Sequence, residues 1–345
     1  MEFFGNREAF ATLDQMVRGG RMPQTLLLSG AEGVGKATLA RRFAGTLLGR
    51  EDLIERDDLS LPENAQIIAE RERWTSEDRV DDPLLFSSHP DFVTFPPEGP
   101  LRQISIHQMR LLKERAQFKP LKGERRVFLI DHIDRANEQA ANSLLKTLEE
   151  PPAHLILVLT AENPYDLLPT IRSRAVPLYL GRLDEADMKE FIDARKLDNP
   201  ERRLALAAGS PGLAASIDLE QYDRRRQAML NLLKAAAGSL SMADWVRQSE
   251  IISQQRSEKL ENYLKVLYQL LEDMLWLANG AGHIRNIDLS SELTALAGKT
   301  SFQWLRTAVT RLDELVEMAR RNIQKSIALD ALVVELRTDR LLCYQ

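Results

Sequence analysis

Residues 30–36 read GAEGVGK, a glycine-rich loop that follows the apolar run 26–28 and opens a helix-like stretch. A strand, such a loop and a helix in this order are typical of a phosphate-binding site. Glycines let consecutive backbone N–H groups surround phosphate oxygens, and the helix N-terminus favours an anion. A glycine-rich turn without a ligand would explain the glycines but not the full spacing. We therefore predict that Gly30, Gly33, Gly35 and Lys36 bind the phosphates of a nucleotide.

The residue after this loop argues against catalysis. In nucleotide-hydrolysing proteins with such a loop, a Ser or Thr after the lysine binds Mg²⁺ through its hydroxyl. This chain has Ala37 at that position and Thr38 one residue later. We keep Thr38 among the candidate cofactor-binding residues and predict no metal ligands. The loop is expected to hold ATP or ADP weakly, or without hydrolysis.

Length, charge and cysteine content narrow the class of protein. With 345 residues the chain is too long for one compact core, so two or three domains are expected. The net charge of −5 does not indicate that the chain as a whole binds nucleic acid. Its single cysteine, Cys343, excludes a disulfide or a cysteine-based zinc site within one chain. The chain shows no secretory signal and no apolar run of about 18 residues, so we expect a soluble cytoplasmic protein without membrane contact.

Short apolar segments alternate with helical periodicity in the first half of the chain. The apolar segments lack polar alternation, as expected of parallel strands that are covered on both faces. This order predicts a doubly wound α/β sheet with ligands at the carboxyl ends of its strands. The predicted strands are Thr25–Ser29, Asp91–Phe95, Arg126–Asp131, Leu155–Thr160 and Val176–Leu180, and the predicted helices are Lys36–Leu48, Ile104–Phe118 and Ala136–Glu149.

The β signal largely ends after Leu180. Residues 50–88 are rich in charge and have scattered apolar residues, which indicates a partly helical insertion. We predict an α/β nucleotide domain at 1–180, a helical lid at 181–218 and an all-helical domain at 219–345. The helices predicted in the last domain are Gln227–Ala237, Ala243–Ala278, Ser301–Arg321 and Ile323–Arg337.

A second half of the nucleotide site is expected where the strand at 126–131 ends. Four apolar residues lead to Asp131, an acid placed to help hold Mg²⁺ beside the loop, although a plain turn residue would fit there too. His132 follows, at a position where hydrolysing proteins with this motif have a glutamate that orients the attacking water. We interpret His132 as a packing or solvent-facing residue without chemistry. The basic clusters at 202–203 and 224–226 are beside acids and are interpreted as solvated helix faces.

Four stretches together resemble the clamp-loader branch of the AAA+ ATPases. They are the loop at 30–36; the strand end at Asp131, followed by NSLLKTLEEPP at 142–152; the run LPTIRSR at 168–174; and the helical stretch Asn322–Arg337. The run 144–152 is the most specific, because an ordinary amphipathic helix stopped by prolines explains its pattern but not its particular residues. The resemblance covers residues 1–215 well and the C-terminal third more loosely.

The resemblance implies a subunit that does not hydrolyse ATP by itself. A motor subunit of this family has a hydroxyl at 37, a glutamate at 132 and a lid arginine near 212, whereas this chain has Ala37, His132 and Gly212. Motor subunits also carry a four-cysteine zinc module after the first helix, and residues 50–88 lack cysteine, so no zinc is expected. Arg174 is retained, and the resemblance implies that it is a catalytic arginine finger donated to the ATP of a neighbouring motor subunit.

The resemblance also implies partners. The C-terminal helices would form the collar of a hetero-pentameric ring with motor (gamma/tau) and delta subunits, which places a sliding clamp on primer–template DNA during replication. The segment around Phe3, Phe4 and Asn6 resembles the part of the family that cups adenine. Two alternatives are an ATPase motor subunit of the same ring and a stand-alone P-loop phosphotransferase, which would leave the run at 144–152 unexplained.

Overall fold

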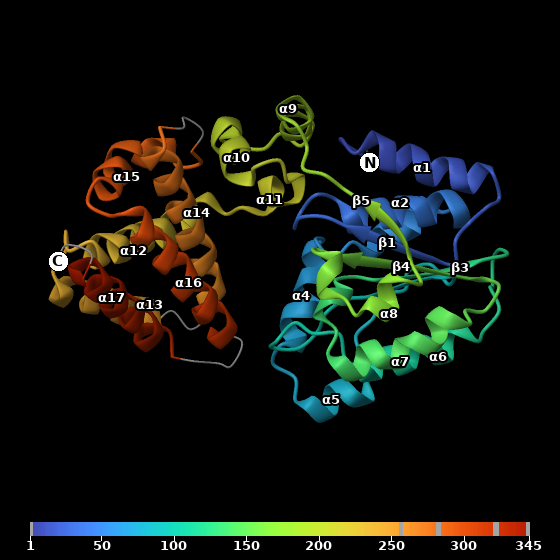
Figure 1. Cartoon of the computed structure of the whole chain (residues 1–345). Coiled ribbons are helices and arrows are strands. Elements are labelled where there is room, and N and C mark those ends of the chain that lie inside the picture. Colours follow the sequence, from blue (N-terminus) through green and yellow to red (C-terminus); the bar gives the residue numbers. More distant parts are fainter. Residues whose placement is uncertain (1–2, 255–257, 281–283, 320–323, 343–345) are drawn as a thin grey trace. The chain divides into compact units, whose positions relative to one another are not determined.

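The computed structural model describes residues 3–254, 258–280, 284–319 and 324–342. Residues 320–323 lie outside the described residues, so the end of the predicted helix Ser301–Arg321 and the start of Ile323–Arg337 are not described. Cys343 also lies outside them. The chain divides into two compact units (Figure 1): unit 1 comprises residues 1–200 and 209–215, and unit 2 comprises 201–208 and 216–345. A separate lid domain at 181–218 stays a prediction. Among the described residues, no helix is both long and apolar enough to cross a membrane.

Unit 1 is built on a sheet of five parallel strands in the order β2-β3-β4-β1-β5. The strands confirm the predicted α/β class, and each bound lies within one residue of its prediction. Ser29 pairs with Ala161 and Ile130 pairs with Leu159, so the ends of β1, β3 and β4 lie at one edge of the sheet. The strands are β1 (Thr25–Ser29), β2 (Phe92–Phe95), β3 (Arg126–Ile130), β4 (Leu155–Ala161) and β5 (Val176–Tyr179).

Helices cover both faces of this sheet, as Figure 1 shows for α1 and α2 on one face and α6 and α7 on the other. Leu26 and Leu28 belong to one apolar cluster and Leu27 to the other, because successive strand residues point to opposite faces. The sequence did not indicate α1. The helices of unit 1 outside the insertion are α1 (Arg7–Arg18), α2 (Lys36–Leu48), α6 (Ile106–Ala116), α7 (Glu138–Glu149), α8 (Pro169–Arg172), α9 (Glu185–Ala194) and α11 (Pro211–Ser216), with short 3-10 turns at Ile133–Arg135 and Pro164–Asp166.

The insertion at 50–88 is partly helical, as predicted. Its elements are α3 (Glu51–Ile54), a 3-10 turn at Glu55–Asp57, α4 (Pro62–Arg71) and α5 (Ser76–Asp81). Phe86 then pairs with Thr94 of β2 through backbone hydrogen bonds of 2.9 and 2.8 Å. Because β2 is an edge strand, this bridge covers backbone groups that would otherwise be open to pairing with another chain.

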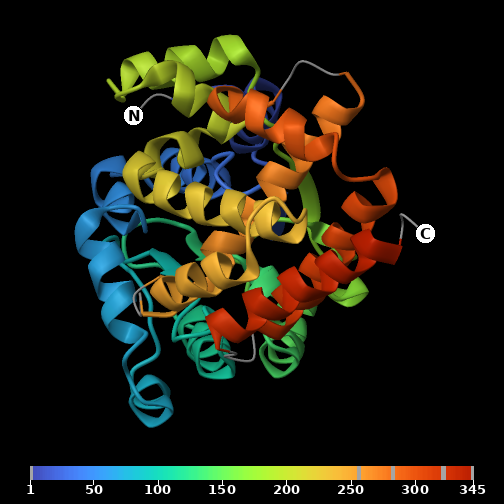
Figure 2. The ribbon, with the colours of Figure 1, turned by 90° about the vertical axis from the view of Figure 1, so that its left-hand side faces the viewer.

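Unit 2 is all helical among its described residues, which agrees with the predicted C-terminal domain. The predicted helix Ala243–Ala278 is in fact two helices, α13 and α14. Figure 2 shows α16 and α17 side by side toward the red end of the chain. The helices are α10 (Pro200–Ala207), α12 (Leu219–Ala236), α13 (Met242–Gln254), α14 (Leu260–Ala278), α15 (Ser290–Ala297), α16 (Phe302–Ala319) and α17 (Lys325–Leu342), with a 3-10 turn at Ile287–Leu289.

Two buried tryptophans hold α17 against the other helices of unit 2. Trp245 of α13 donates its ring N–H to Asp330 Oδ1 at 2.7 Å. Trp304 of α16 donates its ring N–H to the backbone oxygen of Leu336 at 2.8 Å. Both side chains therefore bury a large apolar surface and still satisfy their one polar group.

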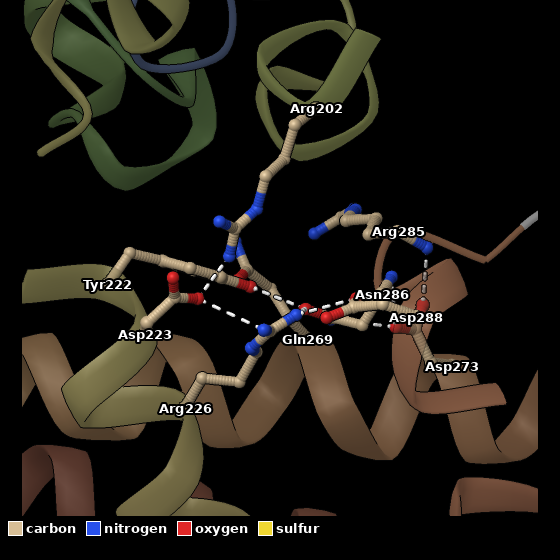
Figure 3. Close-up of polar contacts among 9 residues, drawn as sticks. All are labelled: Arg202, Tyr222, Asp223, Arg226, Gln269, Asp273, Arg285, Asn286 and Asp288. Atoms are coloured by element: carbon tan, nitrogen blue, oxygen red, sulfur yellow. Dashed lines mark hydrogen bonds and ion pairs between the residues drawn. The ribbon is translucent and has the colours of Figure 1, made fainter. Parts of the chain in front are cut away.

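A buried polar cluster links α12 and α14 to the segment before α15 (Figure 3). Asp273 of α14 accepts hydrogen bonds from the backbone N–H groups of Arg285 at 2.9 Å and Asn286 at 3.0 Å. It also accepts one from the Asn286 side-chain amide at 2.8 Å. Asn286 Oδ1 in turn lies 3.1 Å from the hydroxyl of Tyr222 on α12. Asp273, Asn286 and Tyr222 are all buried, so the cluster fixes this connection from inside the unit.

The basic clusters at 202–203 and 224–226 are held by neighbouring acids and backbone. Arg202 and Arg226 both pair with Asp223, and Arg226 also binds Asp288 at 2.7 Å (Figure 3). The side chain of Arg226 is only 11% exposed. The interpretation of these clusters as solvated helix faces is therefore wrong for Arg226, which is an internal ion-pair partner. It is also wrong for Arg203, which is 8% exposed and donates to the backbone oxygen of Ile217 at 2.9 Å.

Tyr222 should make unit 2 less stable in alkaline solution. Burial raises the pKa of Tyr222 from 10 to about 12, and the charge of Arg226 opposes only part of this rise. The neutral phenol therefore stabilises the fold below pH 10, and this contribution is lost as the pH rises through 12. Between pH 9 and 11 the wild-type chain should lose about 1 kcal/mol more unfolding free energy than Tyr222→Phe. Urea unfolding at both pH values checks this.

The matched control is Tyr165→Phe, because Tyr165 is 79% exposed. It should retain the wild-type dependence on pH. An equal alkaline loss in the wild-type chain and in Tyr222→Phe would contradict the assignment to Tyr222.

Candidate functional site

The glycine loop curls at the carboxyl end of β1, as predicted. Gly30, Gly33 and Gly35 have φ angles of 148°, 78° and 100°, which side chains disfavour. A Cβ at Gly30 would lie 2.2 Å from the backbone oxygen of Leu180. The Gly30 N–H donates to the backbone oxygen of Ala161 at 3.2 Å, which ties the start of the loop to β4. Glycine is therefore required at residue 30 by close packing as well as by its φ angle.

The Lys36 side chain lies inside the loop and stabilises the loop conformation. Its ammonium donates to the backbone oxygens of Gly30 at 2.7 Å and Ala31 at 2.9 Å, and the residue is 5% exposed. Burial lowers the pKa of Lys36, and the carboxylates of Glu162 and Asp131 act in the opposite direction. The loop thus carries a buried positive charge with acids around it, and phosphate oxygens would have to replace the two carbonyl contacts.

Asp131 lies directly after β3, near enough to Lys36 for their charges to interact. It is 7% exposed and accepts a hydrogen bond of 2.6 Å from the hydroxyl of Thr160 on β4. The same hydroxyl accepts the backbone N–H of His132 at 2.8 Å. Thr160 therefore fixes the end of β3, a role that sequence reasoning missed although a polar residue in an apolar strand signals it.

Helix α2 begins at Lys36, where the sequence predicted the start of a helix. Gly35 is the left-handed N-cap, and Lys36, Ala37 and Thr38 follow in the helix. Ala37 carries no hydroxyl where a magnesium ligand is expected. Thr38 is half-buried one position later, and its contact with a nucleotide stays a prediction.

The start of α11 packs directly on the loop. The Gly212 N–H donates to the backbone oxygen of Gly33 at 2.8 Å. A Cβ at Gly212 would lie 2.9 Å from the Gly33 Cα, and a Cβ at Gly33 would lie 2.8 Å from the Leu213 nitrogen. An arginine at 212 would therefore have to displace the loop, which explains in physical terms why glycine occupies this position.

The N-terminal segment also borders the loop. Asn6 bonds both backbone groups of Gly181, donating at 3.0 Å and accepting at 2.8 Å. A Cβ at Gly35 would lie 3.3 Å from the ring of Phe3, so this ring covers the start of α2. Adenine binding by the segment stays a prediction.

Arg174 is placed elsewhere, just after α8 and beside the end of α7. Its guanidinium binds Glu149 Oε1 at 2.7 Å and the backbone oxygen of Thr170 at 2.9 Å. The side chain is 33% exposed. Glu149 belongs to the run 144–152, so two of the stretches that suggested a family meet here. The finger role of Arg174 stays a prediction.

His132 has two acidic neighbours that sequence reasoning did not single out. It adopts a left-handed φ of 56°, and its Nδ1 lies 3.9 Å from Glu162 Oε1 and 4.0 Å from Asp134 Oδ1. No sequence spacing indicates this cluster, because Glu162 follows a different strand and reaches His132 only through the β3–β4 pairing.

Part of the chain is similar to known subunits of DNA polymerase III. A family described as DNA polymerase III, delta subunit, matches residues 78–184. The delta′ subunit of DNA polymerase III from Escherichia coli K12 is 31% identical over 62% of this chain and 63% of its own length. The delta′ subunit from Pseudomonas aeruginosa PAO1 is 32% identical over 56% of each chain. The tau subunit from Salmonella typhimurium LT2 is 28% identical over 55% of this chain and 26% of its own.

The matched region spans less than two thirds of each of these relatives. The region that the family model matches, 78–184, includes the strand end at Asp131 and the run at 144–152. Asp131 follows β3 at the carboxyl edge of the sheet, whereas the run 144–152 ends α7 and leads into the start of β4 at the opposite edge. Over this part of its length, the chain is similar to the delta′ subunits of DNA polymerase III.

Proposed function

We propose that this protein is a delta′-type, non-hydrolysing stator of a clamp loader. It completes a ring with gamma/tau and delta subunits, and Arg174 serves the ATP site of a neighbouring motor subunit. The ring uses ATP to place a sliding clamp on primer–template DNA. Similarity to delta′ subunits supports these roles, and the whole assembly and its substrates are part of the proposal.

The observation that carries this proposal is the phosphate loop. It retains three glycines and a buried lysine, yet a methyl group stands at residue 37 and an imidazole at residue 132. Hydrolysis needs a hydroxyl to bind Mg²⁺ and a group to position water, and both are replaced. Gly212 also packs on Gly33, where an arginine would not fit. The loop is suited to hold a nucleotide without cleaving it.

The isolated full chain should hydrolyse ATP in the presence of Mg²⁺ no faster than its Lys36→Ala variant. Lys36 is the only phosphate-binding cation within the loop sequence, so its loss would abolish any turnover that originates there. Steady-state phosphate release by both proteins, at matched concentration and with equal helical content by circular dichroism, checks this.

A gamma/tau-type motor is the second candidate, because a tau subunit matches a similar share of this chain. A motor would turn over ATP at about 1 s⁻¹ or faster when assembled with clamp and DNA, as typical enzymes do. Turnover of the isolated chain in that range, lost in Lys36→Ala, would reject the stator in favour of the motor. Co-purification with motor and delta-type subunits separates both from a stand-alone phosphotransferase, which would purify alone.

A further inference from the structure

Three potential metal ligands meet beside the phosphate loop, on the segments that follow β3 and β4. His132 and Asp134 come from the turn after β3, and Glu162 comes directly after β4. One ligand atom from each residue lies within 4.8 Å of the other two. His132 Nδ1 is 3.9 Å from Glu162 Oε1 and 4.0 Å from Asp134 Oδ1. All three side chains therefore point toward one small volume.

Two of these atoms are buried without hydrogen bonds. Across the part of the chain that the structure describes, neither His132 Nδ1 nor Asp134 Oδ1 has a hydrogen-bond partner. At 4.0 Å they are too far apart to bond each other. A buried polar atom without a partner destabilises a fold by about 1–3 kcal/mol, so such atoms in a native structure require an explanation. A cation between them would satisfy both.

The donor set fits a first-row divalent cation. Imidazole nitrogen and carboxylate oxygen both bind Zn²⁺ at about 2.0–2.2 Å, and imidazole favours Zn²⁺ over Mg²⁺ or Ca²⁺. Two ligand atoms at such distances in a tetrahedral site are about 3.4 Å apart. The separations of His132 Nδ1 from the two carboxylates would have to shrink by about 0.5 Å, which side-chain rotation provides.

A neighbouring residue positions His132, and among the described residues the two nearby cations do not form hydrogen bonds with the three candidate ligands. The His132 N–H is bound to Thr160, which fixes the backbone that carries the ring. Arg135 is the competing cation, and its Nη2 lies 3.6 Å from Glu162 Oε1, beyond hydrogen-bond range. Lys36 interacts electrostatically with the same acids, but its ammonium bonds the loop carbonyls.

We propose that His132, Asp134 and Glu162 form a site for a divalent transition-metal ion, with Zn²⁺ as its preferred occupant. The site uses neither Asp131 nor the nucleotide, so it is distinct from a magnesium–ATP site. It differs from the sequence-based expectation of no zinc, which rested on the lack of cysteine in residues 50–88. Here the ligands are a histidine and two acids that only the sheet brings together.

The full chain, stripped with EDTA and free of nucleotide, should bind one equivalent of Zn²⁺ in isothermal titration calorimetry. His132→Asn should weaken that binding at least about tenfold, because even residues that only support a metal ligand have effects of this size. Asparagine is the suitable replacement, since it tolerates the left-handed backbone at residue 132. Glu162→Gln should weaken binding similarly while retaining the shape of the side chain.

His107→Asn is the matched control, because His107 lies in the same unit on α6 and outside the cluster. It should bind Zn²⁺ like the wild-type chain. Absorption of the Co²⁺-loaded protein should show visible bands that His132→Asn loses. Absence of stoichiometric binding, or binding that neither His132→Asn nor Glu162→Gln weakens, would overturn the proposal. Circular dichroism of each variant excludes unfolding as the cause of a loss.

Discussion

A clamp loader reconstituted with Arg174→Ala should lose the ATP turnover of the site that this arginine completes. An arginine that reaches the transferred phosphate stabilises charge that develops in the transition state, and its removal slows hydrolysis about 10³-fold or more at that site. Turnover of the whole complex should therefore fall by at least the contribution of one site. Steady-state ATPase measurements with clamp and primed DNA check this.

The contacts of Arg174 indicate that its substitution should not unfold the protein, so a loss of activity can be assigned to the arginine itself. Its ion pair with Glu149 is partly exposed, and pairs of this kind contribute about 1 kcal/mol or less, so the fold should tolerate the variant. The same weak pair would let the guanidinium leave Glu149 for a phosphate. Arg174→Lys should also be defective, because an ammonium keeps the charge but not the planar fork of donors.

Arg172→Ala is the matched control, because Arg172 is the last residue of α8, just before Arg174, and stacks on Tyr165, with 5.0 Å between its Cζ and the ring centroid. It should assemble and support ATP turnover like the wild-type chain. If Arg174→Ala assembles and the complex keeps its full activity, Arg174 is only a surface ion-pair partner. Loss of assembly itself would instead assign it to the interface.

Asp273→Ala should destabilise unit 2 by about 3 kcal/mol or more. The substitution removes the acceptor for three donors: two backbone N–H groups and the Asn286 amide (Figure 3). Each donor left buried without a partner destabilises the fold by about 1–3 kcal/mol. Asp273→Asn retains one acceptor oxygen and should have a smaller effect. The free energy from urea unfolding checks both variants.

Tryptophan fluorescence is a suitable signal for the urea unfolding of unit 2. Of the four tryptophans in the chain, Trp245, Trp276 and Trp304 belong to unit 2, so the signal reports mainly on its unfolding. Glu272→Ala is the matched control on the same helix, since its pair with Arg285 is 45% exposed on the acid side. It should change stability by less than about 1 kcal/mol. Equal effects of Asp273→Ala and Glu272→Ala would show that the buried cluster does not stabilise unit 2.

Local sequence patterns were sufficient for the parallel sheet and the phosphate loop. Strands such as Leu155–Ala161 are buried on both faces, so an uninterrupted apolar run between turns predicts them directly. The end of α7 was predicted equally well, because prolines at 151 and 152 stop a helix wherever it packs. Helix α1 was missed, since only Ala9 and Leu13 of its residues are buried and the apolar pattern is short.

The helices of unit 2 show where periodicity is insufficient. Apolar spacing runs through 243–278 and predicts one helix, whereas the structure has α13 and α14. The hydrogen-bond partners of the buried residues Trp245 and Asp273 also could not be predicted. Trp245 binds Asp330, 85 residues away in sequence, and no local pattern encodes that distance.

The amino-acid sequence alone determined the α/β class, the glycine-rich loop at 30–36 and the presence of alanine at 37 and histidine at 132. Each depends on residue type and spacing within one short segment. Only the tertiary structure decided why residue 212 is glycine and which acids surround His132. Those answers depend on the pairing of β3 with β4 and on the packing of α11 against the loop, which join segments that are remote along the chain.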